Sequence, residues 1–167
     1  MANAFTYRHG PRKPVKWAVL SATVIEVGDM VYGVIDSDSA EVKPASDFTW
    51  DTNLATTQGS FAAQFVGIAM ESSASGQTDP ISIDTSSNSV YEMTVPSGTY
   101  YQGDMFGPDE DSSSLKDQVL EKVSTSAAAI ARYAEKDNSS RGTTTSLRVT
   151  FAPAYVTDSA NVNANVG

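Results

Sequence analysis

The residue types that carry out catalysis or bind metals are sparse in this chain. The only histidine, His9, stands beside Gly10 and Pro11 in a basic N-terminal stretch, whereas a catalytic base must be held rigidly. Cysteine is absent, which excludes thiolate nucleophiles and cysteine-based zinc sites. No nucleophile elbow, His-Glu-x-x-His pair, phosphate loop or dinucleotide fingerprint occurs. We therefore expect no catalytic residues and no cofactor, and we expect that the protein is not an enzyme.

Carboxylates are the one chemically active type in good supply, with 20 Asp and Glu residues. They leave a carboxylate-pair hydrolase open as a minor alternative, although most lie in Ser- and Asp-rich stretches where solvation explains them. Asp109-Glu110-Asp111 and the pair Asp36 and Asp38 offer the oxygen ligands that hard cations prefer. Neither cluster has the spacing or glycine of an EF-hand loop, so we predict no metal site.

Charge is distributed unevenly along the chain. Four of the 11 Lys and Arg residues fall in the first sixteen positions, which hold no acid, although the net charge is −9. The acidic remainder repels nucleic acid, and four bases alone make only a salt-sensitive phosphate contact. We expect no direct nucleic-acid binding. No apolar run reaches the length of a membrane span, so we also expect no membrane contact.

Residues 1–16 are predicted to form a basic, extended N-terminal arm. Gly10, Pro11 and Pro14 oppose a helix there. Aromatic residues are unusual in a purely solvating tail, and together with the bases they suit strand addition to a neighbouring molecule. A solvated, disordered terminus is the alternative. The predicted contact residues of the arm are Phe5, Tyr7, Arg8, Arg12, Lys13, Lys16 and Trp17.

Residues 17–156 are predicted to form one domain, a mainly β small barrel or sandwich. Short β-branched and aromatic runs separated by turn residues indicate this class. Residues 17–27 and 30–35 are expected to form two strands around the tight turn at Gly28-Asp29, followed by a long connection over 36–60. Further strands are expected at 61–70, 81–84, 90–95 and 143–151.

The region from 114 to 123 is ambiguous. Ser114 and Asp117 resemble a capping box, and Leu115, Val119 and Val123 share a helical face, but they also fit a period of two. Local propensity favours one short helix over 114–123, and the strand alternative stays open. Residues 157–167 are expected to be a flexible C-terminal tail.

A short motif occurs twice. Gly28-Asp29-Met30 returns as Gly103-Asp104-Met105, and each copy is followed later by an apolar run containing Ile-Ala, at 66–69 and 129–132. This repetition suggests two similar β-units folded against each other. The alternative is that Gly-Asp is simply a frequent turn pair.

The order of these motifs over residues 15–155 resembles the small β-barrel decoration, or capsid-stabilising, proteins of tailed bacteriophages. The resemblance implies a structural virion protein on the capsid exterior, made in the host cytoplasm, that binds the major capsid protein and cements neighbouring capsomers. It implies self-association, often as a trimer, and an N-terminal arm that reaches the capsid or an adjacent subunit. It also implies strands at 118–123 and 128–132, and we adopt a strand over 127–133.

A carbohydrate- or receptor-binding β-module on a virion or cell surface is the alternative function. Trp50, Tyr91, Tyr100 and Tyr101 are candidates for an aromatic binding platform. Packing in the core and at strand edges is the competing explanation for these four side chains.

Overall fold

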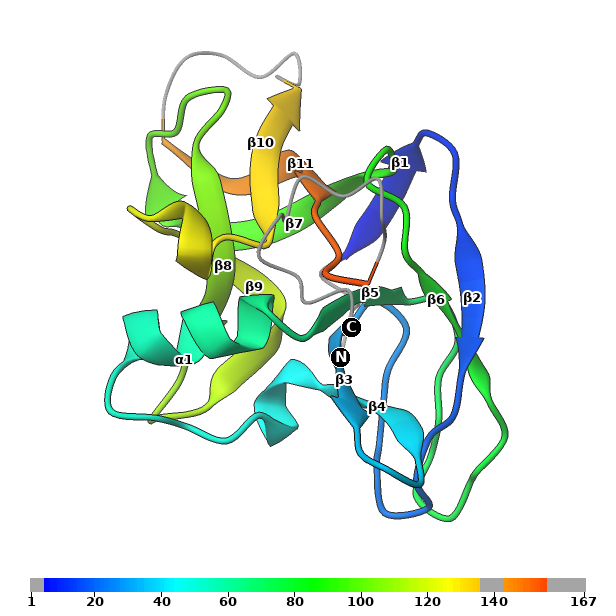
Figure 1. Cartoon of the computed structure of the whole chain (residues 1–167). Coiled ribbons are helices and arrows are strands. Elements are labelled where there is room, and N and C mark those ends of the chain that lie inside the picture. The colour runs from blue at the N-terminus through cyan, green and yellow to red at the C-terminus, as the bar shows by residue number, and fades with distance from the viewer. Residues whose placement is uncertain (1–4, 136–142, 156–167) are drawn as a thin grey trace.

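The protein is mainly β, as predicted, and contains a closed β-barrel and one α-helix (Figure 1). The computed structural model describes residues 5–135 and 143–155. The first four residues of the predicted arm and the predicted tail at 157–167 lie outside the described residues. Within the described ranges, no helix is both long and apolar enough to cross a membrane.

The strands form two sheets, and each sheet is built from one continuous half of the chain. Unit 1 has the order β2-β6-β5-β3-β4, and unit 2 has the order β7-β11-β10-β8-β9, with β1 added to β7. The strands of unit 1 are β2 (Pro14–Trp17), β3 (Met30–Ile35), β4 (Ala40–Pro44), β5 (Phe65–Ala69) and β6 (Ile81–Asp84). Those of unit 2 are β7 (Val90–Gly98), β8 (Met105–Glu110), β9 (Leu115–Lys122), β10 (Ala131–Glu135) and β11 (Thr144–Phe151), and β1 is Thr6–His9.

Each sheet curls until its two outer strands meet. In unit 2, β7 and β9 pair in parallel at Thr94 and Val119, which closes a five-stranded barrel. In unit 1, the residue after β2, Ala18, forms a parallel bridge with Glu41 of β4, and the N–H of Val42 donates to the Ala18 carbonyl at 3.0 Å. Both units therefore close through the same pair of strands, the first and the third.

The two units also share their strand registers. When the first strands are aligned at Pro14 and Val90, pairs in the other strands also match, and the β8–β9 register departs from that of β3–β4 only beyond Pro108. The matched backbone pairs are Pro14–Asp84 with Val90–Thr150, Val31–Pro44 with Phe106–Lys122, Ile68–Asp84 with Arg132–Thr150, and Ala18–Glu41 with Thr94–Val119. The chain is thus one five-stranded unit present twice, which agrees with the repeat expected from the sequence.

The Gly-Asp motifs occupy equivalent turns before the second strand of each unit. Gly28 and Gly103 have φ values of 97° and 91°, a region that glycine adopts without strain. Their N–H groups donate to Ala69 and Tyr133 carbonyls at 2.8 and 3.0 Å. The Asp29 carboxylate accepts from the Glu26 N–H at 2.7 Å, and the Asp104 carboxylate accepts from the Tyr101 N–H at 3.0 Å. Ala69 corresponds to Tyr133, so the Ile-Ala part of the expected repeat is two residues out of register.

Two hydrophobic clusters stabilise the fold. The smaller cluster fills unit 1, with Val31, Val42 and Ile83 fully buried. The larger cluster fills unit 2 and reaches unit 1, where Phe65 of β5 packs against Phe151 of β11 with ring centroids 5.7 Å apart. Burying side chains of this size contributes about 2 kcal/mol each, so the contact between the units is part of the core.

The prediction of a helix over 114–123 was wrong, since residues Leu115–Lys122 form β9. Ser112 and Ser113 have positive φ values of 54° and 65°, and the Asp111 and Ser114 backbones exchange hydrogen bonds of 2.8 and 3.1 Å. This geometry is a two-residue hairpin turn. Ser114 is therefore the first residue after a hairpin turn and caps no helix. The expected strand over 127–133 begins only at Ala131, after the short 3-10 helix η2 (Ser126–Ala128).

The helix of the protein lies elsewhere, within the predicted long connection. After the 3-10 helix η1 (Ala45–Asp47), α1 runs over Leu54–Ala62. The Asn53 side chain caps it by accepting from the Thr56 N–H at 3.0 Å, as N-cap asparagines do. Gln58 and Phe61 are buried on its inner face. The expected strand over 61–70 is therefore limited to Phe65–Ala69.

Residues 18–29 form a loop, so the strand predicted over 17–27 was wrong, whereas the strand predicted at 30–35 is present as β3. Val19, Thr23 and Ile25 are buried and alternate with exposed Leu20 and Val24. This alternation imitates a strand, but the loop contributes only isolated bridges, including one between Ile25 and Ser73. The strands expected at 81–84, 90–95 and 143–151 are present as β6, β7 and β11.

Candidate functional site

The predicted arm is folded onto the body of its own chain. β1 pairs with β7 of unit 2, and β2 pairs with β6 of unit 1. Phe5 is 6% exposed, with ring centroids 4.7 Å from Tyr91 and 5.9 Å from Phe151. Tyr7 also packs edge-on against Tyr91, at 5.6 Å. The arm was expected to be separate from a body that begins at residue 17. In this structure its strands instead pair with strands of the same chain, because Phe5 and Tyr7 pack against the core.

Two of the four arm cations are paired with carboxylates of the body. Arg8 bonds to Glu92 at 2.8 Å, and Lys16 bonds to Glu71 at 2.6 Å. Trp17, the last predicted contact residue, packs near Tyr155 with ring centroids 5.8 Å apart. These side chains hold β1 and β2 in place, so they are poorly placed to bind a partner.

Asp84 is the centre of a buried polar cluster that fastens the N-terminal segment to both units. This residue is 2% exposed. Its carboxylate accepts from the Lys13 and Ser86 N–H groups, each at 3.0 Å, and from the Ser89 and Tyr91 hydroxyls at 2.7 and 2.6 Å. Burial raises the pKa of Tyr91, and its hydrogen bond to Asp84 raises it further. The cluster links β2, β6 and β7.

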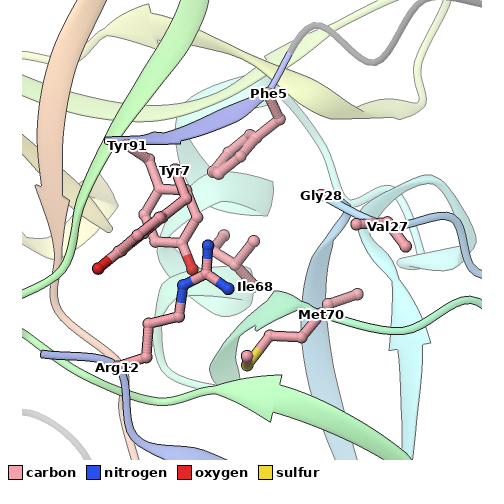
Figure 2. Close-up of a pocket in the computed structure, with 9 residues that line it drawn as sticks. Phe5, Tyr7, Arg12, Val27, Gly28, Ile68, Met70 and Tyr91 are labelled. Atoms are coloured by element: carbon pink, nitrogen blue, oxygen red, sulfur yellow. The ribbon is translucent and has the colours of Figure 1, made fainter. Parts of the chain in front are cut away.

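A small cleft of about 90 Å³ lies where the N-terminal segment crosses between the two units (Figure 2). Tyr7, Arg12 and Tyr91 stand on one side of it, and Val27, Gly28 and Met70 on the other. The complete lining is Phe5, Tyr7, Arg12, Val27, Gly28, Ile68, Ala69, Met70 and Tyr91. The cleft thus exposes polar and apolar surface in about equal measure, with one cation at its edge.

Arg12 and Lys13 are the two arm cations that remain available. The Arg12 guanidinium lies over the Tyr7 ring, 3.5 Å from its centroid, an arrangement that leaves its charge uncompensated by an acid. Both residues are exposed, and within the described parts of the chain neither forms an ion pair. The chain as a whole has a net charge of −9. Arg12 and Lys13, which lie between β1 and β2, therefore form a local cationic surface beside the small cleft.

A second, wider depression of about 580 Å³ lies beside α1. It is lined by Tyr32, Val34, Lys43, Asp47, Phe48, Thr49, Trp50, Asp51, Ser60 and Gln64. Most of these residues belong to the connection between β4 and β5, residues 45–64, whereas the equivalent connection in unit 2 covers only residues 123–130. The depression is therefore an addition to one copy of the repeated unit. A long connection over 36–60 was expected from the sequence, but the depression was not, because the shape of this connection depends on packing against unit 2.

The predicted aromatic platform is not assembled. Tyr91 is buried, and Tyr100 packs on Phe106 at 5.4 Å while its hydroxyl donates to the Pro96 carbonyl at 2.6 Å. Tyr101 is 69% exposed but lies in unit 2. Trp50 alone of the four lines the wider depression.

The acidic clusters considered for cations have local partners. The Asp36 carboxylate accepts from the Asp38 and Ser39 N–H groups, which lowers its pKa. Asp109 bonds to Lys116 at 2.6 Å. Over residues 5–135 and 143–155, no group of three or more His, Asp or Glu side chains is arranged to hold a metal ion.

Comparison with protein-family models, curated proteins and solved structures found no match to this chain. The candidate sites are therefore the small cleft with Arg12 at its edge and the wider depression lined by Trp50, here the Trp50 depression.

Proposed function

We propose that the protein is a structural, non-enzymatic component of a tailed-bacteriophage head. It binds the major capsid protein on the outer surface of the assembled capsid and cements neighbouring capsomers, and it self-associates, with the trimer as the working hypothesis. It is made in the host cytoplasm and resides in the virion. The motif order of the sequence supports this proposal through the family it resembles.

The observation that carries the proposal is the exposed cation pair Arg12 and Lys13, of which Arg12 lines the small cleft between the two units. An exposed cation pair on an acidic chain attracts an acidic protein surface and disfavours other partners. The neighbouring cleft is large enough to receive one aliphatic side chain. The N-terminal segment therefore serves as a rigid contact, since Phe5 and the Asp84 cluster hold its strands in place.

The test is co-sedimentation of the purified chain with heads of the phage that encodes it, prepared without this protein. Arg12→Gln is expected to weaken binding by about tenfold and to reduce its salt dependence, because the cation faces the partner. Lys43→Gln, which removes one positive charge from the lining of the wider depression, is the control and is expected to bind as the parent chain does. Equal binding by the parent and Arg12→Gln would contradict the role of the cleft.

Saccharide binding at the Trp50 depression is a second candidate function. A partly exposed indole beside acidic, amide and ammonium groups offers both an apolar face and hydrogen-bond partners. In a Trp17→Phe variant, Trp50 becomes the single tryptophan reporter. Retention on an array of bacterial glycans, lost in Trp50→Ala and accompanied by a change in Trp50 fluorescence with the free glycan, would support this function. Absence of any retained glycan would contradict it.

A further inference from the structure

The repeated unit places exposed apolar side chains in equivalent loops. The loop between the first and second strands covers residues 18–29 in unit 1, here the first apolar loop, and 99–104 in unit 2, here the second apolar loop. Of the six exposed large hydrophobic residues in the described chain, four lie in these loops: Leu20 (48%), Val24 (53%), Val27 (44%) and Tyr101 (69%). Two equivalent loops thus carry most of the apolar surface that the core does not use.

Both loops are held in place by contacts made by other residues than the exposed Leu20, Val24 and Tyr101. Ile25, four residues before Asp29, is 1% exposed and fills the core of unit 1. Tyr100, at the equivalent position before Asp104, packs on Phe106. The Ile25 and Ser73 backbones exchange two hydrogen bonds of 2.9 Å. Fixed, exposed apolar groups bind a partner without the entropic cost of ordering a flexible loop.

An arginine lies beside each loop. Arg12 lines the same cleft as Val27 and Gly28 (Figure 2). In unit 2, exposed Arg132 donates to the carbonyl of Gly103, the equivalent glycine, at 3.1 Å. Each loop therefore has a cation beside its turn glycine and at least one exposed large hydrophobic residue, a combination that suits a partner surface with apolar and acidic groups.

The two loops lie at different ends of the molecule. The segment between β2 and β3 extends to the bottom of Figure 1, and the segment between β7 and β8 extends to its upper left. One partner molecule placed against the first apolar loop would therefore leave the second free for another.

We propose that the chain is bivalent: the first apolar loop with Arg12 contacts one copy of the partner, and the second apolar loop with Arg132 contacts a second copy of the same partner. This inference rests on the proposed function, because a capsid lattice presents many copies of one protein. It deepens that function, since cementing requires one molecule to hold two lattice subunits at once. Linking two weak contacts in one chain raises the overall affinity by about a hundredfold or more without a new contact.

The test compares one variant of each loop on intact heads: Leu20→Ser with Val24→Ser for the first, and Tyr101→Ser with Arg132→Gln for the second. Ile35→Ser is the matched control, because Ile35 is 56% exposed but lies at the far end of β3 from the turn. Affinity is measured by co-sedimentation, and cementing by the temperature at which coated heads break. Circular dichroism and thermal melting establish that each variant is folded.

We expect each one-loop variant to bind heads about a hundredfold more weakly than the parent. At concentrations that saturate the heads, each should coat them without raising their breaking temperature. The combined variant should not bind, and Ile35→Ser should match the parent. Parental affinity in either one-loop variant, or full cementing by either, would overturn bivalency while leaving capsid binding intact. A parent chain that does not bind heads would overturn the proposed function and bivalency together.

Discussion

Asp29 and Asp104 occupy equivalent turns but sit in different electrostatic surroundings, which makes a matched experiment available. Asp29 is 4% exposed, and burial raises its pKa from 3.8 to about 6. The nearby Asp117 carboxylate also raises this pKa, whereas the hydrogen bond from Gln118 acts to lower it. Because the folded state holds this proton more tightly than the unfolded state, Asp29 contributes most to stability below pH 3.8, and that contribution is lost as the pH rises through about 6.

The substitution Asp29→Asn fixes this position in a neutral form. The Asn oxygen keeps the bond from the Glu26 N–H, and its NH₂ group donates to Gln118 once that amide turns over. A pKa difference of about two pH units corresponds to about 2 to 3 kcal/mol. We expect the unfolding free energy of Asp29→Asn, relative to the parent, to rise by that amount between pH 3.5 and 7.5, with most of the change between the unfolded-state pKa of 3.8 and the folded-state pKa of about 6.

The assay is urea unfolding of the parent and the variant across this pH range, with Asp104→Asn as the control. Burial acts to raise the pKa of Asp104, but hydrogen bonds from Lys122 and the Tyr101 N–H outweigh it, and the net pKa is lowered. Asp104→Asn should therefore become less stable relative to the parent as the pH rises toward and just past 3.8, the opposite sign, and should change no further up to pH 7.5. A difference for Asp29→Asn that does not change with pH, or that falls as the pH rises, would refute the reasoning.

Three further substitutions test the fold by urea unfolding at neutral pH. Asp84→Ala should cost at least about 3 kcal/mol, because it leaves buried N–H and O–H donors without an acceptor; a loss below about 1 kcal/mol would mean that the cluster does not fasten the N-terminal segment. Gly67→Ala should cost about 3 kcal/mol or more of unfolding free energy, since its Cβ would lie 2.1 Å from the Asp84 carbonyl oxygen. The control Gly76→Ala, whose Cβ would have no atom within 4 Å, should cost only about 1 kcal/mol. Equal losses in the two variants would contradict the close approach of the Gly67 and Asp84 backbones. Replacing Ser112 and Ser113 with Asn and Gly should stabilise the chain by about 1 kcal/mol, because both positions have positive φ; destabilisation would argue against this turn type.

The sequence was informative where strands are delimited by turns that the residues themselves specify. Strands β6, β7 and β11 follow from β-branched runs bounded by Ser, Asn, Gly or Pro. The repeated Gly-Asp motif pointed to equivalent turns because only glycine adopts their backbone conformation without strain. These signals are local, so they survive without knowledge of the tertiary packing.

The failures occurred where distant contacts outweigh local preference. β9 has helix-compatible spacing, but the Ser112–Ser113 turn and pairing with β8 force it to extend. Residues 18–29 alternate like a strand because the loop covers the core of unit 1. The helix α1 was missed because it contains poor helix formers, namely Thr56, Thr57 and Gly59. It forms because Asn53 caps it and because unit 2 supports it: the Gln58 amide donates to the Pro108 carbonyl at 2.9 Å.

The candidate site was predicted only in part. The sequence identified the basic, aromatic segment, but it could not distinguish the cations that body carboxylates neutralise from the two that stay available. That division depends on Glu71 and Glu92, which are far from the arm in sequence and adjacent to it after folding. Charge composition reveals a basic segment, whereas its residual charge is a property of the fold.

The placement of β1 and β2 on different units also has a kinetic consequence. β1 pairs with β7, and β2 pairs with β6, so each of these strands is synthesised well before its partner. Pairing across such separations is slow to form. The two N-terminal strands therefore join their units late in folding, after the strands that receive them have been made.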